Sequence, residues 1–319
     1  MELSVILPVY NSEKTLPHTL TSLLDQKCDF SWEIVAVDDG SRDESLSVLQ
    51  KYEEAANEKG ISFRILSFEN KGVGVNRNRG LDAAQGDVIL FLDADDLLLP
   101  DALSLMMAKK KETGASILLF DSEFLYPDGT VSPFPMANAE EGFLSVTEYM
   151  LSHPCPWNKL IDREIFTKHR FRFEEGILYE DLALIPALAR DLEGTIYYYK
   201  KPLHRYFQSE GSIMRSSPAE KRLDLFPALE ALYRNAKPYR VETEYLFFLH
   251  LYRDAVWTFW ESGNRSAILR AKDLMKRYFP HWRKNPLIRT NFSRAERFAA
   301  FLFYLPSFFL LKLWKGSGK

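Results

Sequence analysis

The stretch VILFLDADDLLLP, Val88 to Pro100, sets three aspartates at the point where an apolar run ends. Its first half is typical of a buried β-strand, and Asp93, Asp95 and Asp96 follow directly. Carboxylates this close repel one another, so they cost stability unless a cation or hydrogen-bond donors lie among them. A helix cap would account for Asp96 alone. The stretch therefore predicts a binding site at the end of a strand.

The first half of the chain alternates between strand-like and helix-like segments. Apolar runs occur at residues 3–9, 33–38, 63–67, 88–93 and 116–120, and helix-like segments at 12–26, 43–60 and 75–86. This order predicts an α/β fold with a mostly parallel sheet covered by helices on both faces. Ligands of such sheets bind beyond the carboxyl ends of the strands. Those ends carry polar groups that packing does not explain, at positions 8–11, 38–41, 70–72 and 93–96.

Length and charge distinguish two regions. The 319 residues suffice for two domains. From His281 to Lys319, eight basic residues accompany one acidic residue, a charge of +7 that leaves −10 for the rest of a chain whose net charge is −3. Cys28 and Cys155 make no disulfide framework and indicate a reducing compartment. The N-terminus has no basic region or cleavage site, so we expect no secretion signal.

The glycine-rich stretch does not match the common nucleotide-binding motifs. Gly72, Gly74 and Gly80 do not have the G-x-G-x-x-G spacing, and no P-loop is present. Arg77 and Arg79 lie beside these glycines. Guanidinium groups pair with phosphates and bases in planar geometry, but a solvated turn and helix start would explain the same residues.

Four segments, in this order, resemble family 2 glycosyltransferases. They are VILPVYNSEKTL at 5–16, IVAVDDGSRDES at 34–45, NKGVGVNRNRGLDAAQGDVILFLDADD at 70–96 and YED at 179–181. The resemblance covers about the first 215 residues. It implies a Rossmann-like GT-A domain at 1–216, which binds a nucleotide-sugar donor, with UDP favoured. A helical region at 217–319 follows.

The donor-binding residues that the resemblance implies lie at the strand ends. They are Pro8 and Tyr10 for the nucleoside, Asp38 and Asp39 for the uracil imide, Asn70 at the third strand end, and Arg77 for uracil or phosphate. The D-x-D motif maps to Asp93, nearer the ribose, and Asp95, which would hold Mn²⁺ or Mg²⁺. Hard cations take oxygen ligands, usually one or two carboxylates with substrate phosphates. A cation there would stabilise the departing nucleotide.

A second carboxylate is expected to activate the acceptor. An acceptor hydroxyl is a weak nucleophile until a base takes its proton. Glu180 and Asp181 begin an apolar helical run, where an acidic pair is also common for its effect on the helix dipole. By resemblance Asp181 is the base of a single in-line displacement that inverts the anomeric configuration.

Two further segments are expected near the donor or acceptor. Trp157, Asn158 and Lys159 resemble a Trp-Asn-Lys segment beside the acceptor cleft, although a buried Trp commonly belongs to the core. The family often places a His or Arg shortly before a Gly-Ser-Ile-like segment, whereas this chain has Phe207, Gln208 and Ser209 there. In the family that His or Arg can reach the metal or the diphosphate. Either His204 or Arg205 takes this role here, or the loop contacts the donor through Ser212 and Arg215.

The last residues combine an apolar run with basic flanks. Residues 298–311 carry no charge and are broken by Pro306. They are short for a membrane span and better suited to an interfacial segment, and basic clusters beside apolar helices bind anionic lipids. Docking on the domain or on another subunit is the alternative. We expect the tail, about 292–319, to hold the protein on the inner face of the cell membrane, near a glycan or lipid-linked saccharide acceptor of surface-polysaccharide assembly.

Two other functions use similar residues. A metal-dependent nucleotidyltransferase also needs paired aspartates, but it predicts a basic, glycine-rich loop where this chain has PVYNSEKT, and it leaves Asp181 without a role. A non-catalytic sugar-binding scaffold would tolerate loss of the carboxylates, yet Asp39, Asp93, Asp95 and Asp181 are all present. The basic cluster coincides with an apolar tail and not with an aromatic platform, so we expect no nucleic-acid partner.

Overall fold

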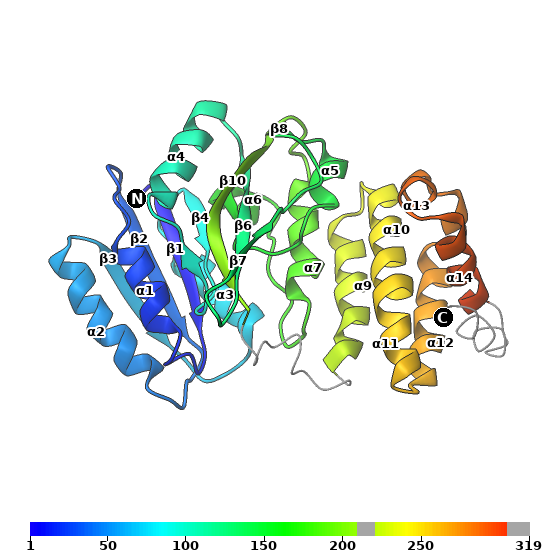
Figure 1. The fold of residues 1–319 in the computed structure, drawn as a ribbon, viewed down its shortest axis with the longest axis horizontal. Helices are drawn as coiled ribbons and strands as arrows, with labels where there is room; N and C mark the ends of the chain where they lie inside the picture. The colour runs from blue at the N-terminus through cyan, green and yellow to red at the C-terminus, as the bar shows by residue number, and fades with distance from the viewer. Residues whose placement is uncertain (209–220, 305–319) are drawn as a thin grey trace. The chain divides into compact units, whose positions relative to one another are not determined.

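A computed structural model describes residues 1–208 and 221–304. The chain divides into two compact units, Met1–Ser217 and Pro218–Lys319. Figure 1 shows a sheet with flanking helices in the first unit and helices in the second.

The first unit is built on one mixed sheet. Its order is β3-β2-β1-β4-β9-β6-β10-β5, with β7 beside β6 and β8 beside β10. The strands are β1 (Leu3–Val9), β2 (Trp32–Asp38), β3 (Ser62–Ser67), β4 (Val88–Phe91), β5 (Leu97–Leu98), β6 (Ile117–Leu125), β7 (Val131–Phe134), β8 (Gly142–Phe143), β9 (Lys159–Asp162) and β10 (Ile196–Phe207). β1 to β4 pair in parallel, and antiparallel β9 separates β4 from β6. The sequence predicted the parallel half but not β9.

Helices cover both faces of this sheet, as expected. They are α1 (Leu16–Leu24), α2 (Ser45–Glu58), α3 (Val73–Ala83), α4 (Ala102–Thr113), α5 (Val146–Met150), α6 (Arg163–Lys168) and α7 (Glu180–Leu184), with a 3-10 turn at Ile185–Ala189. Every residue of β1 and β2 is buried, as in sheets with two covered faces. Alternate β1 side chains pack with α1, α2 and α4 in one core. Helix α3 packs on the opposite face of the sheet. On that face Phe91 of β4 also packs on Phe166 of α6.

A glycine allows α3 to approach the sheet closely. Gly80 faces Ile6 of β1, and a Cβ atom at Gly80 would collide with the Ile6 side chain. Any larger residue would force α3 away from the strand. This contact fixes the helix that carries Arg77.

The second unit is helical, as predicted. Its helices are α9 (Leu225–Asn235), α10 (Arg240–Phe248), a π-helical segment (Leu249–Ala255), α11 (Val256–Glu261), α12 (Arg265–Tyr278), α13 (Pro286–Asn291) and α14 (Arg294–Tyr304), with 3-10 turns at Lys221–Asp224 and Trp282–Lys284. Aromatic rings fill its core, for example Phe247 against Phe279 and Phe248 against Trp282. In the part of the chain that the structure describes, no helix is long and apolar enough to cross a membrane. Most of the apolar tail, from residue 305 on, lies outside that part.

The packing of α3 on β1 yields a stability prediction. Gly80→Ala should lower the free energy of unfolding by about 2 kcal/mol, because the new methyl group overpacks the contact with Ile6. Urea denaturation measures this change. Asn57→Ala, at an exposed position of α2, should change stability by less than about 0.5 kcal/mol. Equal stability of Gly80→Ala and wild type would contradict the close packing.

Candidate active site

The carboxyl ends of β1, β2 and β4 meet at one edge of the sheet. β1 pairs in parallel with β2 on one side and with β4 on the other. Beyond these ends the Asp39 amide donates to the Val9 carbonyl at 2.9 Å, and the Leu92 amide donates to Ile6 at 3.0 Å. Asp39 and the aspartates after Leu92 therefore leave the sheet at the same edge, as the sequence predicted.

Asp38 and Asp39 are buried and held by the protein itself. Asp38 accepts hydrogen bonds from the Ser41 amide at 3.0 Å and the Ser67 hydroxyl at 2.8 Å. Asp39 accepts from the amides of Lys71 at 3.0 Å and Gly72 at 2.8 Å. Each side chain is almost fully buried. The pair thus fixes the loop before α3, and contact with uracil remains a prediction.

The three aspartates after β4 differ in exposure. The Asp93 side chain is 26% exposed and Asp95 is partly exposed, whereas Asp96 is fully buried. Burial, with the charges of Asp96 and Asp93, raises the pKa of Asp95 to about 7. Asp96 does not cap a helix, since α4 begins at Ala102 and Asp96 accepts from the Phe207 amide at 3.0 Å. Asp93 and Asp95 are therefore the two that remain available to a ligand.

Arg77 connects the D-x-D motif with the Glu-Asp pair. Its guanidinium donates to Asp93 Oδ1 at 3.0 Å and to Glu180 Oε1. The Arg77 side chain is 5% exposed and that of Glu180 is 8% exposed. Neighbouring carboxylates raise the pKa of Arg77, so it is always charged. Residues separated by about half of the first unit thus share one buried ion cluster.

Asp181 lies in the first turn of α7, next to this cluster. It is partly exposed, whereas Glu180 is buried. Burial, with the negative charge of Glu180, raises the pKa of Asp181 to about 7, although Arg77 acts in the opposite direction. A carboxyl group with this pKa can accept a proton near neutral pH. The structure therefore places a group suited to acid–base work beside Arg77 and Asp93.

The Trp157-Asn158-Lys159 segment is buried. The Lys159 ammonium donates to the carbonyls of His153 at 2.9 Å and Cys155 at 2.8 Å and to Asn158 Oδ1 at 2.7 Å. Burial lowers the pKa of Lys159 to about 8. The acceptor role of these residues remains a prediction, and their contacts account for them as parts of the core.

The buried ring of His204 contacts Asp96 in the aspartate loop (residues 93–96). Its Nδ1 lies 3.1 Å from Ser122 Oγ and its Nε2 lies 3.1 Å from Asp96 Oδ2, so neither nitrogen faces an open site. Burial lowers the pKa of His204 to about 3, which keeps the ring neutral. Trp157 stacks on this ring with centroids 4.4 Å apart. Arg205, the alternative residue, pairs with Glu123 at 2.9 Å, and Ser212 and Arg215 lie outside the described residues.

Exposure separates the remaining predicted donor residues. Tyr10 is 45% exposed and Asn70 is exposed, whereas Pro8 is buried within β1. Phe68 was not among the predicted donor residues. It is 40% exposed, and its ring centre lies 4.1 Å from the Arg79 guanidinium carbon. The only signal in the sequence was an aromatic residue directly after a strand.

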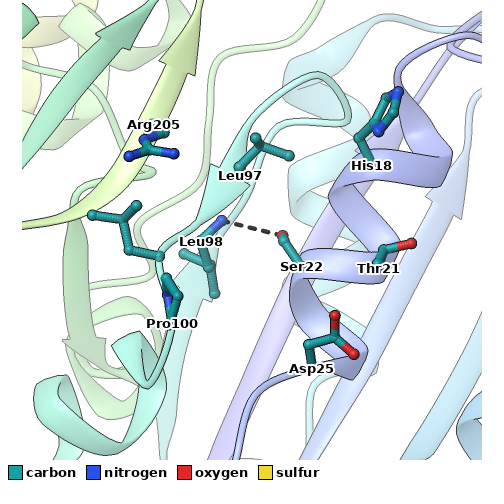
Figure 2. A pocket seen from close by; sticks show the side chains of 9 residues that line it. His18, Thr21, Ser22, Asp25, Leu97, Leu98, Pro100 and Arg205 are labelled. Carbon is teal, nitrogen blue, oxygen red and sulfur yellow. Dashed lines mark hydrogen bonds between the residues drawn. The ribbon is translucent and has the colours of Figure 1, made fainter. Parts of the chain in front are cut away.

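A hollow of about 250 Å³ lies between α1 and β5. Figure 2 shows its lining residues, His18, Thr21, Ser22, Asp25, Leu97, Leu98, Pro100 and Arg205. The Leu98 amide donates to Ser22 Oγ at 3.2 Å. Arg205, one of the two residues considered for the role before the Gly-Ser-Ile-like segment, lines this hollow, whereas Asp93, Asp95 and Asp181 do not.

Known proteins share both the sequence and the fold. The model of the family described as Glycosyl transferase family 2 matches residues 4–170. The chain belongs to this family. It is 29% identical over 260 residues to the "Putative glycosyltransferase EpsH" of Bacillus subtilis, a match that covers 77% of this chain and 74% of that protein.

A second relative has solved structures. Over 122 residues the chain is 37% identical to poly(ribitol-phosphate) beta-N-acetylglucosaminyltransferase TarS of Staphylococcus aureus, covering 37% of this chain and 20% of TarS. The crystal structure of S. aureus TarS 1–349 in complex with UDP-GlcNAc superposes with a TM-score of 0.74 at 21% identity, covering 95% of this chain and 89% of that one. This likeness confirms the expected fold.

The raised carboxyl pKa values yield a prediction for stability. Between pH 6 and 8 the unfolded carboxyl stays ionised, while in the folded protein Asp95 and Asp181, with pKa values of about 7, each lose a proton. Each group should therefore lower the free energy of unfolding by about 1.4 kcal/mol over this range. In urea denaturation, Asp95→Asn or Asp181→Asn should remove that decrease. Asp101→Asn, at an exposed site, should not, and identical pH dependence in all variants would contradict the assignment.

Proposed function

We propose that this protein is an inverting glycosyltransferase that moves a sugar from a nucleotide sugar, with UDP favoured, to a hydroxyl group of a glycan or lipid-linked saccharide. The observation that carries the proposal is the single cluster formed by Asp93, Arg77 and Glu180, with Asp95 and Asp181 beside it. The names of the relatives and the UDP-GlcNAc complex of TarS support this choice. Bacterial surface-polysaccharide assembly is the proposed setting.

Asp181 would act on the acceptor. It would take the proton of the attacking hydroxyl, and a pKa of about 7 suits that task at neutral pH. Attack from the side opposite the leaving nucleotide inverts the anomeric centre, so an α-linked donor would give a β-glycoside. The nucleotidyltransferase alternative gives Asp181 no obvious role.

Asp95 and Asp93 fit a hard divalent cation. Their oxygens are the ligand type that Mg²⁺ and Mn²⁺ prefer. Burial, followed by the charges of Asp96 and Asp93, raises the pKa of Asp95, and a bound cation would favour its ionised form. Within residues 1–208 and 221–304, no three His, Cys, Asp or Glu side chains form a metal-binding group. The proposed cation would therefore be shared with the diphosphate, where it would act as a Lewis acid toward the leaving group.

Release of nucleoside diphosphate tests the proposal. Wild type should release it from one of a panel of UDP-, GDP- and dTDP-sugars with Mn²⁺ and lose this activity with EDTA. Asp181→Asn should reduce turnover by at least about 100-fold, because general-base catalysis contributes that much or more, and Asp95→Asn should lose the response to Mn²⁺. Asp101→Asn is the matched control.

The outcomes of this assay separate the alternatives. Binding of a UDP-sugar with no turnover under any condition would favour the non-catalytic scaffold. Release of inorganic pyrophosphate from a nucleoside triphosphate would instead favour the nucleotidyltransferase. Full activity of Asp181→Asn would contradict the assigned base.

We also propose that the C-terminal region binds the inner face of the cell membrane. Arg283, Lys284, Arg289 and Arg294 are exposed near the start of the tail, and Phe298 is 56% exposed. Basic residues beside exposed apolar side chains suit anionic lipid surfaces. This location would bring the enzyme close to a lipid-linked acceptor.

Vesicle co-sedimentation tests the membrane proposal. Binding to vesicles with phosphatidylglycerol should exceed binding to phosphatidylcholine alone, and Arg289→Ala with Arg294→Ala should weaken it by about 1 kcal/mol for each charge removed. Arg42→Ala, at an exposed site in the first unit, is the control. Equal binding of the double variant and wild type would contradict the proposal.

A further inference from the structure

Helix α3 holds the segment that leads to Asp181, here called the base-bearing segment (residues 171–181). The Asn78 side chain exchanges two hydrogen bonds with the Phe173 backbone, each 2.9 Å long. Gly74 lies so close to the Glu174 carbonyl that a Cβ atom would collide with it. One face of α3 therefore packs directly on the backbone of this segment.

Arg77 lies between these two contacts on the same helix. Its guanidinium binds Glu180 and Asp93, and its carbon lies 5.4 Å from the centre of the Phe173 ring. Because Glu180 immediately precedes Asp181, the ion pair with Arg77 fixes the backbone at the base. The contact with Asp93 fixes the same guanidinium to the D-x-D loop.

Burial makes it unfavourable for the Arg77 guanidinium to leave Glu180 and bind a phosphate instead. Glu180 is 8% exposed, and its carboxylate forms an ion pair with Arg77. Moving the guanidinium to a phosphate would leave a carboxylate buried without its cation, at a cost of several kcal/mol. Binding of the donor through the nitrogen that now holds Glu180 would require that loss.

We infer that Arg77 is a positioning residue that sets the location of the Asp181 carboxylate relative to Asp93, through Glu180 and the base-bearing segment. The inference rests on the proposed function for the role of Asp181. It replaces the expected contact of Arg77 with uracil or phosphate. It also makes α3 the element that couples the donor side of the site to the acceptor side.

Two variants and a matched control test the inference. Arg77→Lys keeps the charge but not the two-armed geometry, and Glu180→Gln removes the partner's charge. Arg64→Lys is the control. Arg64, on β3, binds buried Glu33 with two nitrogens, as a two-armed arginine should, and also donates to the Ala83 carbonyl at the far end of α3. Three quantities are measured. They are kcat for release of UDP from the UDP-sugar that wild type uses, the Kd of UDP with Mn²⁺, and the rate of amide hydrogen exchange in residues 171–184.

A positioning role predicts a specific combination of results. Arg77→Lys and Glu180→Gln should each lower kcat by about 100-fold, as expected for a misplaced base. The Kd of UDP should change by less than about threefold. Hydrogen exchange of the base-bearing segment should speed up by about tenfold or more, because its local opening becomes easier. Arg64→Lys should leave all three close to wild type.

Other results would overturn the inference. A large increase in the Kd of UDP with unchanged kcat would make Arg77 a donor contact. Unchanged exchange and unchanged kcat would remove any positioning role. If Arg77→Lys does not fold, Glu180→Gln decides between these results by the same measurements. If wild type uses no donor, the proposed function fails, and the exchange of residues 171–184 still decides whether Arg77 holds the segment.

Discussion

The site depends on one buried guanidinium between two carboxylates. Arg77 binds Asp93 and Glu180, which come from segments far apart in the chain. Without a cation, acidic side chains packed this densely would repel one another and take up protons. A single positive charge on α3 thus allows the D-x-D loop and the start of α7 to lie side by side. The close contact of Gly80 with Ile6 fixes that helix against the sheet.

The structure separates acidic side chains that the fold uses from those that remain available. Asp38 and Asp39 accept hydrogen bonds from neighbouring loops, Asp96 accepts from Phe207, and Glu180 binds Arg77. These four are buried. Asp93, Asp95 and Asp181 are partly exposed. Four of these seven carboxylates are therefore buried in contacts within the fold, and the other three reach solvent, where we propose that they meet the donor, its cation and the acceptor.

Much of this was predictable from sequence, because local patterns carry it. Apolar strands followed by polar residues identified the sheet edge, and the D-x-D and Glu-Asp motifs identified the three available carboxylates. Long-range pairing was not predictable: nothing near Arg77 indicates a partner 103 positions away. The same is true of β9, which enters between β4 and β6, and of His204, whose neutral ring supports Asp96 from β10. The sequence could not decide whether aromatic and basic residues such as Trp157 and Arg77 are buried or bind a ligand. Their burial depends on neighbours in the fold that are distant in the sequence.

We propose that the carboxylates at this sheet edge hold a nucleotide through a divalent cation. Anomalous scattering from crystals soaked with Mn²⁺ and UDP tests it most directly, because Mn²⁺ can be located without any assumption about the donor sugar. We expect one strong peak within ligand distance of Asp95, with the UDP diphosphate on its other side and Arg77 still bound to Glu180. A nucleotide bound elsewhere, or a Mn²⁺ peak away from Asp93 and Asp95, would contradict it.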